Sequence, residues 1–299
     1  MESLEIDESG CARFGWDVSG RNIQRAHYIF ATMIDRGRHP ILGVSINAVD
    51  YEAAVGSVIS AAKEGRAMTV TCSAVHGVML GALDAEHRAR LNSFDMIVPD
   101  GQPVRWALRW RHGIRLRDRV RGVDFMLAIC ERAAAEQVPV FLFGNRRETL
   151  DRLARELKKR FPALVIAGMR PSAFREVTEE EKKILADEIK RSGAKLVFAG
   201  LGCPRQEFWA YENRHLLSMP IVGIGSAFDS NAGSVPAPPA WMQRSGLEWA
   251  FRLAQEPRRL WKRYLVLNPL YLLFIGGEIL GVYRFDPGTD REPVATRVG

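Results

Sequence analysis

From Pro40 to about Phe228, short apolar runs alternate with longer charged segments in which apolar residues recur at helical spacing. Apolar runs of this length indicate strands, and a repeat of about 3.6 residues indicates a helix. Regular alternation of the two is typical of β-α-β units, which line up parallel strands in one sheet and place helices on its faces. The sequence therefore predicts an α/β, Rossmann-like fold with a mostly parallel sheet flanked by helices.

The predicted elements follow one another with short connections. Strands are expected at 41–46, 67–71, 96–98, 138–143, 164–167, 195–199 and 221–224. Helices are expected at 51–63, 74–83, from 102 onward, 122–137, 146–160, 178–191 and 204–217. Thr178 and Glu181 have the spacing of a capping box, which supports the helix that begins there.

Changes in amino-acid composition and hydrophobic pattern divide the chain into four parts. Residues 1–39 are polar and rich in glycine, with one helical pattern at 21–35, and are expected to be an N-terminal extension. Residues 40–234 form the α/β core, and the 47% hydrophobic content of the chain is enough for a sizeable core. Residues 235–285 are a C-terminal appendage, and residues 286–299 are expected to be a disordered tail.

The appendage combines two kinds of sequence. Residues 241–264 place tryptophan and tyrosine beside arginine and lysine, which suits a membrane headgroup region, a phosphate-bearing ligand or an ordinary amphipathic helix packed on the sheet. Residues 265–283 are almost long enough to span a bilayer, which needs about 20 apolar residues. Asn268, Pro269 and Glu278 argue against a clean span, because a carboxylate in the bilayer core is costly. We expect this segment to insert into the membrane interface, as part of a helical membrane-associating appendage.

Charge and cysteine content narrow the partners and the compartment. Lysine plus arginine exceeds aspartate plus glutamate by 42 − 35 = 7, which suggests a partner with phosphates or an anionic membrane surface. The acidic N-terminus lacks the basic start and apolar run of a secretory signal. The cysteines are Cys11, Cys72, Cys130 and Cys203. They are far apart and form no C-x-x-C pair, so neither a disulfide framework nor a zinc site is indicated. A reducing compartment, the cytoplasm, fits this cysteine content best.

Several predicted strands end in glycine, at Gly144, at Gly200 and Gly202, and at Gly223 and Gly225. Glycine at a strand end lets a ligand come close to the backbone, so these turns are candidate binding loops. The sequence has neither the dinucleotide fingerprint nor the phosphate loop of ATP-binding proteins, which disfavours NAD and ATP chemistry. A sugar nucleotide is compatible, because backbone amides, helix N-termini and arginines can hold its diphosphate.

Asp100 lies where the strand at 96–98 runs into a turn bounded by Pro99 and Gly101. Ligands of open α/β sheets bind at the carboxyl ends of the strands, so Asp100 is a candidate catalytic base. Its local sequence equally fits a helix cap for the helix that begins near Gln102, and caps are common. The turn by itself does not decide between these roles.

Six separated stretches resemble the WecG/TagA/CpsF bacterial glycosyltransferases, also called glycosyltransferase family 26. In order and spacing they cover roughly residues 45–265, and the last is the most specific. They are Thr69–His76, Val98–Gly101, Arg119–Asp124, Gly200–Glu207, Gly223–Asp229 and Gly246–Arg259.

The resemblance implies transfer of a sugar, with inversion, from a UDP-sugar to a polyprenyl-diphosphate-linked saccharide during polysaccharide assembly. It implies no metal and no other cofactor, and a C-terminal appendage that meets the membrane. The protein is therefore expected at the cytoplasmic face of the bacterial inner membrane, as a peripheral or monotopic protein. A homo-oligomer is compatible with the resemblance, because an appendage can complete a neighbouring subunit's site.

Residue by residue, the resemblance implies roles for three catalytic positions. Asp100 matches the proposed general base, which would deprotonate the acceptor hydroxyl as that oxygen attacks the anomeric carbon. Thr71 matches a threonine near the donor sugar. Arg119 matches an arginine that would stabilise the leaving diphosphate through charge-assisted hydrogen bonds.

Further positions match substrate-binding residues. Gln206 and Asp229 match residues of the nucleotide pocket, where an amide and a carboxylate could contact uracil and ribose. Arg252, Arg259 and Arg263 match the basic appendage, where they could hold the lipid diphosphate.

The sequence departs from the family pattern at Ser73, where asparagine is usual, and at Val75, where an acidic residue is usual. Because serine and asparagine offer different hydrogen bonds, Ser73 favours a donor other than the N-acetylated one. N-acetylmannosamine, its uronic acid and glucose all occur as donor sugars in the family. His76 also matches the motif, and either contacts ligand or has a structural role at a helix start.

A function of another class also fits part of the sequence. Arginines concentrate at 111–121, as in a non-catalytic module that tracks the phosphates of nucleic acid or of a lipid surface. Such a module needs neither the glycine-ended strands nor Asp100. A glycosyltransferase is therefore the leading hypothesis, and nucleic acid is not expected as a partner.

Overall fold

The computed structural model describes residues 33–239, 241–242, 245–286, 288, 293 and 298–299. The elements described below belong to the compact unit Ile34–Gly299. The helix predicted at 21–35 lies outside the described residues apart from its last three positions, and most of the predicted tail at 286–299 also lies outside them.

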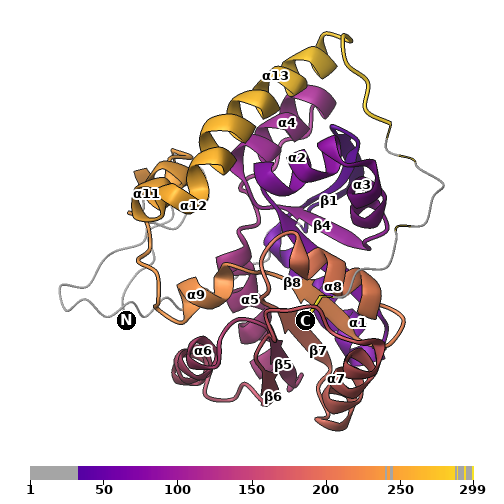
Figure 1. Cartoon of the computed structure of the whole chain (residues 1–299), viewed down its shortest axis with the longest axis vertical. Coiled ribbons are helices and arrows are strands. Elements are labelled where there is room, and N and C mark those ends of the chain that lie inside the picture. The colour runs from indigo at the N-terminus through magenta and orange to yellow at the C-terminus, as the bar shows by residue number, and fades with distance from the viewer. Residues whose placement is uncertain (1–32, 240, 243–244, 287, 289–292, 294–297) are drawn as a thin grey trace, which may run out of the picture. The chain divides into compact units, whose positions relative to one another are not determined.

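Six parallel strands form the central sheet, as the sequence predicted (Figure 1). Every neighbouring pair in the sheet is parallel. Their carboxyl ends therefore meet at one edge, and glycine or Asp100 follows several of them. In spatial order the strands are β4 (Met96–Pro99), β3 (Met68–Ser73), β8 (Pro220–Gly223), β7 (Leu196–Ala199), β5 (Val140–Phe143) and β6 (Ile166–Arg170).

Alternate residues of each strand enter two different apolar layers, because successive side chains of a strand point to opposite faces. In β5, Val140 and Leu142 belong to one layer, and Phe141 and Phe143 belong to the other. The first layer is covered by α1 (Tyr51–Glu64), α5 (Gly122–Ala135), α6 (Arg147–Arg160) and α9 (Ala227–Asn231). The second is covered by α2 (Val75–Leu83), α3 (Ala85–Asn92), α4 (Gln102–His112), α7 (Glu179–Arg191) and α8 (Arg205–Asn213).

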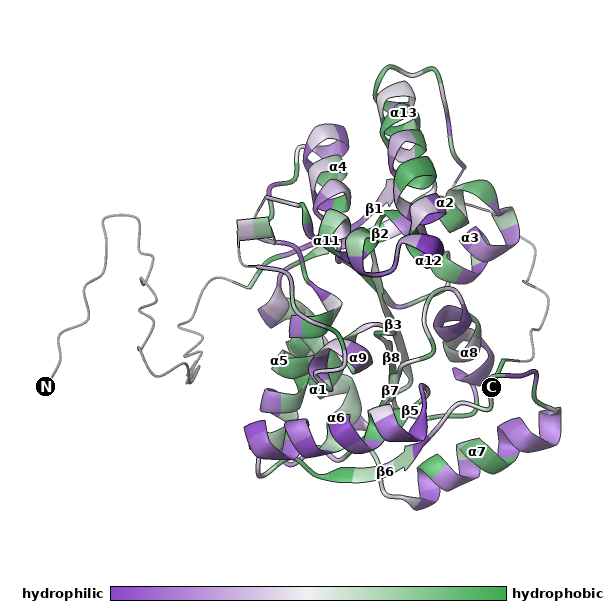
Figure 2. Cartoon of the chain, turned by 60° about the vertical axis from the view of Figure 1, so that its left-hand side comes forward, coloured by the Kyte–Doolittle hydropathy of each residue, from purple (hydrophilic) through white to green (hydrophobic). Residues whose placement is uncertain are grey.

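The covering helices are amphipathic, as their sequence periods indicated. Figure 2 shows α6 and α7 carrying mostly hydrophilic residues, interrupted by the apolar ones that pack on the sheet. The predicted capping box is present at α7: Thr178 Oγ1 accepts from Glu181 N at 3.2 Å, and Thr178 N donates to Glu181 Oε2 at 2.8 Å. Helix α8 ends at Asn213, four residues before the predicted end.

The strand predicted at 41–46 is wrong, because the chain reverses within it. Strands β1 (Asp35–Ile41) and β2 (Val44–Val49) form an antiparallel hairpin. Its two turn residues, Leu42 and Gly43, have φ of 50° and 80°, as two-residue hairpin turns require. The turn contains neither the asparagine nor the aspartate that usually marks such a loop, and Leu42 is apolar and fully buried. The turn therefore carried no local signal in the sequence. The hairpin lies beside β4, where Ile97 N donates to Asn47 Oδ1 at 2.8 Å.

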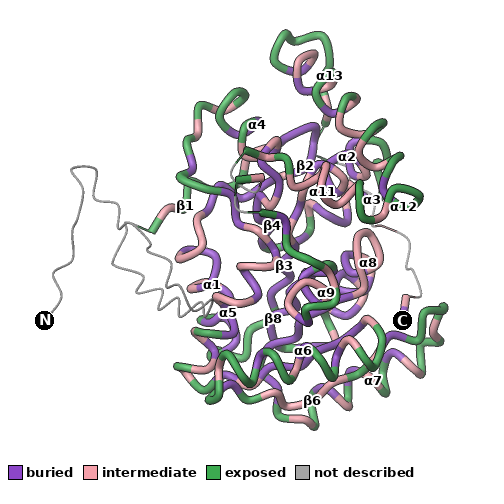
Figure 3. Tube along the Cα trace, turned by 90° about the vertical axis from the view of Figure 1, so that its left-hand side faces the viewer, coloured by how far each residue is buried: buried purple, intermediate pink, exposed green. Residues whose placement is uncertain are grey.

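The C-terminal appendage is helical and packs on the second apolar layer. It consists of α11 (Glu248–Gln255), α12 (Pro257–Trp261), the π-helical turn η1 (Lys262–Val266) and α13 (Leu267–Ile279). Tyr271, Ile275 and Glu278 form the buried side of α13, and the Tyr271 hydroxyl donates to Pro103 O at 3.1 Å. Leu272, Leu273 and Ile279 of α13 are exposed (Figure 3). Its other apolar side chains are partly buried against the second layer, at Leu267, Leu270 and Phe274. In the described part of the chain, no helix is long and apolar enough to cross a membrane.

Candidate active site

Two neighbouring cavities lie where the appendage meets the carboxyl ends of the strands. The sheet-end cavity, of about 350 Å³, is lined by the turns after β3, β7 and β8 and by residues of α8, α9 and the appendage. The appendage cavity, of about 120 Å³, lies between the Asp100 turn, the basic loop before α5 (residues 113–121) and the helices α11, η1 and α13. Residues common to both cavities are Ala74, Asp100, Gly122, Ser226, Arg252, Arg263 and Tyr264.

Asp100 therefore stands at the junction of the two cavities. It follows β4 directly, and its backbone N donates to Ser73 O at 3.1 Å, which fixes it beside the end of β3. The cap of α4 is Gly101, and no side chain caps that helix, so the Asp100 carboxylate is not used as a cap. Burial raises the pKa of Asp100 and the neighbouring Arg119 opposes this rise. A half-buried carboxyl with a raised pKa, facing a cavity, suits a general base.

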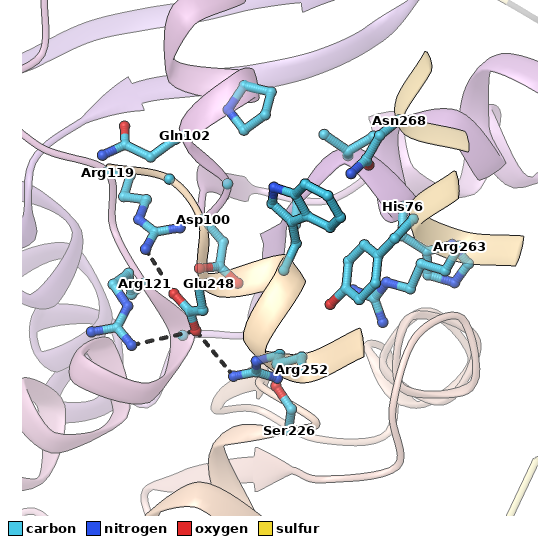
Figure 4. A pocket seen from close by; sticks show the side chains of 18 of the residues that line it. His76, Asp100, Gln102, Arg119, Arg121, Ser226, Glu248, Arg252, Arg263 and Asn268 are labelled. Atoms are coloured by element: carbon cyan, nitrogen blue, oxygen red, sulfur yellow. Dashed lines mark hydrogen bonds and ion pairs between the residues drawn. The ribbon is translucent and has the colours of Figure 1, made fainter. Parts of the chain in front are cut away.

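Glu248 of α11 is the centre of an ion-pair cluster in the appendage cavity (Figure 4). Its carboxylate lies 2.7 Å from Arg119 Nη2, 3.5 Å from Arg121 Nη2 and 3.2 Å from Arg252 Nη2. Burial alone would raise the pKa of Glu248, but Arg121, Arg119 and Arg252 outweigh it, and the pKa is lowered. The carboxylate is thus held ionised beside Asp100. Sequence reasoning gave no role to Glu248 or Arg121, although both lie inside stretches that carry the family resemblance.

The basic loop presents two arginines to this cavity, one on each side of a buried valine. Val120 is fully buried between Arg119 and Arg121, and its N donates to Pro99 O at 3.0 Å. Residues on either side of such an inward residue point the other way, so both guanidinium groups reach Glu248. Arg121 N also donates to the Tyr51 hydroxyl at 2.8 Å, which anchors the start of α5 to α1.

The three arginines predicted in the appendage reach the cavities to different degrees. Arg252 and Arg263 line both cavities, and Arg259 lines only the sheet-end cavity. Arg259 is largely exposed and pairs with Glu256, with 2.6 Å between Nε and Oε2. Among the described residues, no carboxylate oxygen lies within 4.0 Å of Arg263, so its guanidinium group has no protein anion beside it.

Four of the predicted substrate-binding residues line the sheet-end cavity: Ser73, Gly202, Gln206 and Asp229. Gly202 has a φ of 81°, a left-handed conformation that favours glycine. Gln206 is buried, and its Oε1 accepts from the backbone N of Gly225 at 2.7 Å. Asp229 Oδ1 accepts from Asn145 Nδ2 at 3.0 Å. These contacts hold the turns after β5, β7 and β8 in one arrangement around the cavity.

Two predicted residues do not line either cavity. Thr71 is buried within β3, and its hydroxyl donates to Glu207 Oε1 at 2.7 Å. Gly144 lies where two turns approach each other, and a Cβ there would come within 2.9 Å of the Gly200 backbone. The glycine is therefore required by packing between the two turns. Glu207, which does line the sheet-end cavity, received no role from the sequence.

His76 lines the appendage cavity from the first turn of α2. Its Nδ1 is buried and has no hydrogen-bond partner. Burial, and then the nearby Arg263, lower its pKa to about 4, so the imidazole is neutral near pH 7. A neutral ring with a free nitrogen can exchange a hydrogen bond with a ligand in this cavity.

The candidate site is built from side chains and backbone amides. Among the described residues, no group of three or more histidine, cysteine, aspartate and glutamate side chains is arranged to hold a metal ion. The charged groups that do converge are three arginines around one glutamate, with Asp100 beside them.

Comparison with known proteins gives a consistent result. The chain is 30% identical over 210 residues to the N-acetylglucosaminyldiphosphoundecaprenol N-acetyl-beta-D-mannosaminyltransferase of Bacillus subtilis (strain 168), which covers 70% of this chain and 79% of that protein. It is 33% identical over 187 residues to the protein of the same name from Bacillus spizizenii (strain ATCC 23059 / NRRL B-14472 / W23), covering 62% and 70% of the two chains. The profile of one family, described as Glycosyl transferase WecG/TagA/CpsF family, matches residues 39–284. This chain therefore belongs to the WecG/TagA/CpsF family of glycosyl transferases.

Proposed function

We propose that this protein transfers a sugar, with inversion, from a UDP-sugar to a polyprenyl-diphosphate-linked saccharide, with Asp100 as the general base. The observation that carries the proposal is the place of Asp100 between two cavities of different chemistry. One cavity then receives the donor and the other the acceptor, and the reacting atoms meet at the carboxylate. The names of the two Bacillus relatives, which specify a lipid diphosphate acceptor, support this choice of acceptor.

The sheet-end cavity suits the donor. It lies at the carboxyl ends of parallel strands, where open α/β sheets bind nucleotides. Its lining includes the glycine turns Gly200–Gly202 and Gly225, and polar side chains such as Asp229. Backbone amides can approach phosphate oxygens closely in such turns, and a carboxylate can accept from ribose hydroxyls. Arg252 and Arg263, which reach both cavities, can neutralise the charge that develops on UDP as it leaves.

The appendage cavity suits the acceptor. Arg119, Arg121, Arg252 and Arg263 line it, and arginine binds phosphate groups through charge-assisted, often bidentate hydrogen bonds. The acceptor hydroxyl would point to Asp100, which removes its proton while the oxygen attacks the anomeric carbon. The C–O bond to UDP breaks on the opposite face of the sugar, so the configuration is inverted. No metal ion has a step in this scheme, because the arginines supply the positive charge.

The acceptor's lipid chain requires access to a membrane, and the outer side of the appendage is suited to it. The exposed apolar side chains there include Trp261, Leu265, Leu272, Leu273 and Leu280. Exposed apolar patches of this kind mark interaction surfaces, and Arg258 and Lys262 nearby would attract anionic lipid headgroups. We therefore place the enzyme at the cytoplasmic face of the bacterial inner membrane, attached through the appendage without a span.

The decisive experiment is a screen of UDP-sugars for turnover with a synthetic lipid-diphosphate saccharide as acceptor. It is run with the wild type and with Asp100→Asn, which preserves shape and removes the base. The variant should bind UDP within about threefold of the wild type while its turnover falls by about 10² to 10⁴, the usual contribution of general base catalysis. Turnover that is unchanged in the variant would remove Asp100 from the mechanism. A wild type that binds anionic vesicles but no UDP-sugar would indicate a non-catalytic lipid-binding protein.

A further inference from the structure

Glu207 is a buried carboxyl group at the sheet-end cavity that the scheme above does not use. It lies in the first turn of α8 and is 2% exposed. Its Oε1 accepts two hydrogen bonds, from Thr71 Oγ1 at 2.7 Å and from Gln206 Nε2 at 2.9 Å. Its Oε2 is buried and has no hydrogen-bond partner. Glu207 is also among the residues that line the sheet-end cavity, so a molecule bound there would lie next to this side chain.

The surroundings of Glu207 favour the protonated acid over the carboxylate. Among the described residues, no lysine or arginine nitrogen lies within 4.0 Å of it, so no ion pair offsets the loss of hydration. Burial raises the pKa of Glu207, and hydrogen bonds from Thr71 and Gln206, together with its own backbone N–H and the Cys203 thiol, oppose the rise only in part. The neighbouring thiols of Cys72 and Cys203 are themselves buried, and their raised pKa keeps them neutral. An unpaired buried charge would cost far more than a neutral acid.

The hydrogen bonds also place the proton. Thr71 and Gln206 both donate to Oε1, which is therefore occupied as an acceptor. A protonated carboxyl has one O–H donor, and only Oε2 is free to carry it. A protonated Glu207 would therefore be a fixed hydrogen-bond donor, made from a residue that ordinarily only accepts. Carboxylic acids kept neutral by an apolar site act as donors in other enzymes.

We propose that Glu207 is a neutral carboxylic acid whose Oε2–H donates a hydrogen bond to an acceptor oxygen of the nucleotide-sugar donor. The identity of the ligand rests on the proposed function, whereas the protonation state of Glu207 does not. Thr71 and Gln206 then act through Glu207 as positioning residues, because their polar hydrogens are directed to its Oε1. This accounts for a threonine that matches the family pattern and yet lies beneath the cavity wall.

Two substitutions distinguish a neutral Glu207 that donates a hydrogen bond from an ionised Glu207 that accepts one. Glu207→Gln keeps the size and can present an N–H to the ligand while its oxygen accepts from Thr71, so UDP and UDP-sugar affinity should stay within about threefold. Glu207→Leu removes the donor and leaves the ligand oxygen unpaired, so affinity should fall at least about tenfold. Glu212→Gln is the matched control, because Glu212 is on the same helix, pairs with Lys182 at 3.6 Å and lies outside the cavities.

These affinities are measured by isothermal titration calorimetry with UDP and with UDP-sugars. A loss for UDP itself places the acceptor oxygen on the nucleotide, and a loss confined to UDP-sugars places it on the sugar. Either pattern supports the proposal. If Glu207→Gln loses as much affinity as Glu207→Leu, Glu207 is an ionised acceptor and the proposal is wrong. If neither variant loses affinity, Glu207 makes no contact with the ligand and the proposal is also wrong.

A second measurement does not depend on any ligand or on the Leu variant folding. The infrared spectrum of the unliganded wild type at pH 7 should contain the C=O stretch of a protonated carboxyl, and this band should be missing in Glu207→Gln but present in Glu212→Gln. Absence of the band in the wild type overturns the neutral acid. If the band is present but the wild type binds no UDP compound, the proposed donor is wrong while the protonation state stands.

Discussion

Glu248→Gln tests whether one carboxylate holds the appendage on the core. Glu248 is the first residue of α11, and Arg119 and Arg121 belong to the loop before α5, more than 120 positions away in sequence. The pair between Glu248 and Arg119 is short, at 2.7 Å, and both side chains are largely buried, with 13% and 8% exposed. Glutamine preserves the shape and one acceptor oxygen but removes the charge. Arg119 and Arg252 then lose this carboxylate as a partner, whereas Arg121 keeps its ion pair with Asp124 at 2.8 Å.

The size of the effect follows from this burial. Removing one partner of a buried ion pair typically costs about 3–5 kcal/mol, and glutamine recovers part of this through its remaining hydrogen bond. We expect the free energy of unfolding to fall by about 1.5–3 kcal/mol. Glu256→Gln is the matched control, because Glu256 also pairs with an arginine, Arg259, at 2.6 Å. That pair is largely exposed, and exposed pairs contribute only about 0–1 kcal/mol.

The assay is urea unfolding of the full chain at pH 7, followed by circular dichroism, together with kcat/KM for the lipid-linked acceptor. The pH dependence gives a second check. The pKa of Glu248 is lowered in the folded state, so its contribution is complete above its unfolded pKa, about 4.3, and is lost as the pH falls through the folded value. The difference between wild type and variant should thus be constant near neutral pH and shrink only in acid. Equal destabilisation by Glu248→Gln and Glu256→Gln would refute the reasoning.

Three further predictions concern the base, the donor and the membrane. Because burial raises the pKa of Asp100, the acidic limb of the kcat/KM profile should lie above the ordinary aspartate pKa of about 3.9, and a limb at or below that value would contradict the assignment. Ser73 is buried and lines the sheet-end cavity, so Ser73→Asn should shift relative turnover toward N-acetylated donors in a competition assay; unchanged preference would show that position 73 does not read the sugar. Replacing Leu272 and Leu273, 51% and 60% exposed, by Gln should weaken sedimentation with anionic vesicles, whereas the equally exposed Ile184→Gln on α7 should not; similar losses in both would point away from the appendage.

Much of the core was predictable because its signals are local. Strand runs, helical periods and the Thr178 capping box depend on residues a few positions apart, and they predicted a mostly parallel sheet with helices on both faces. The position of Asp100 at a strand end was also readable, since Pro99 and Gly101 mark the turn. The hairpin at Leu42 was missed because a buried apolar turn residue carries no local turn signal.

Contacts between residues that are distant in the sequence could not be predicted from such local signals. Thr71 and Gln206 were predicted to face substrate, but 136 positions separate Thr71 from the Glu207 carboxyl that accepts its hydrogen bond. Such a contact depends on how β3 and α8 are placed by the sheet, and a one-dimensional pattern does not contain that placement. The same holds for the convergence of Arg119, Arg121 and Arg252 on Glu248.

The sequence by itself thus determined the α/β architecture, the chain's resemblance to one glycosyltransferase family and the residue types of the site. Only the tertiary structure decided that Asp100 faces two cavities and does not cap α4. It also decided in which direction the pKa of each buried carboxyl group moves. Three arginines lower the pKa of Glu248. Burial raises the pKa of Glu207, which has no lysine or arginine nitrogen within 4.0 Å among the described residues. The physical reason is that a carboxyl group's pKa depends on its solvation and neighbouring charges, which are set by folding and not by the residue's identity.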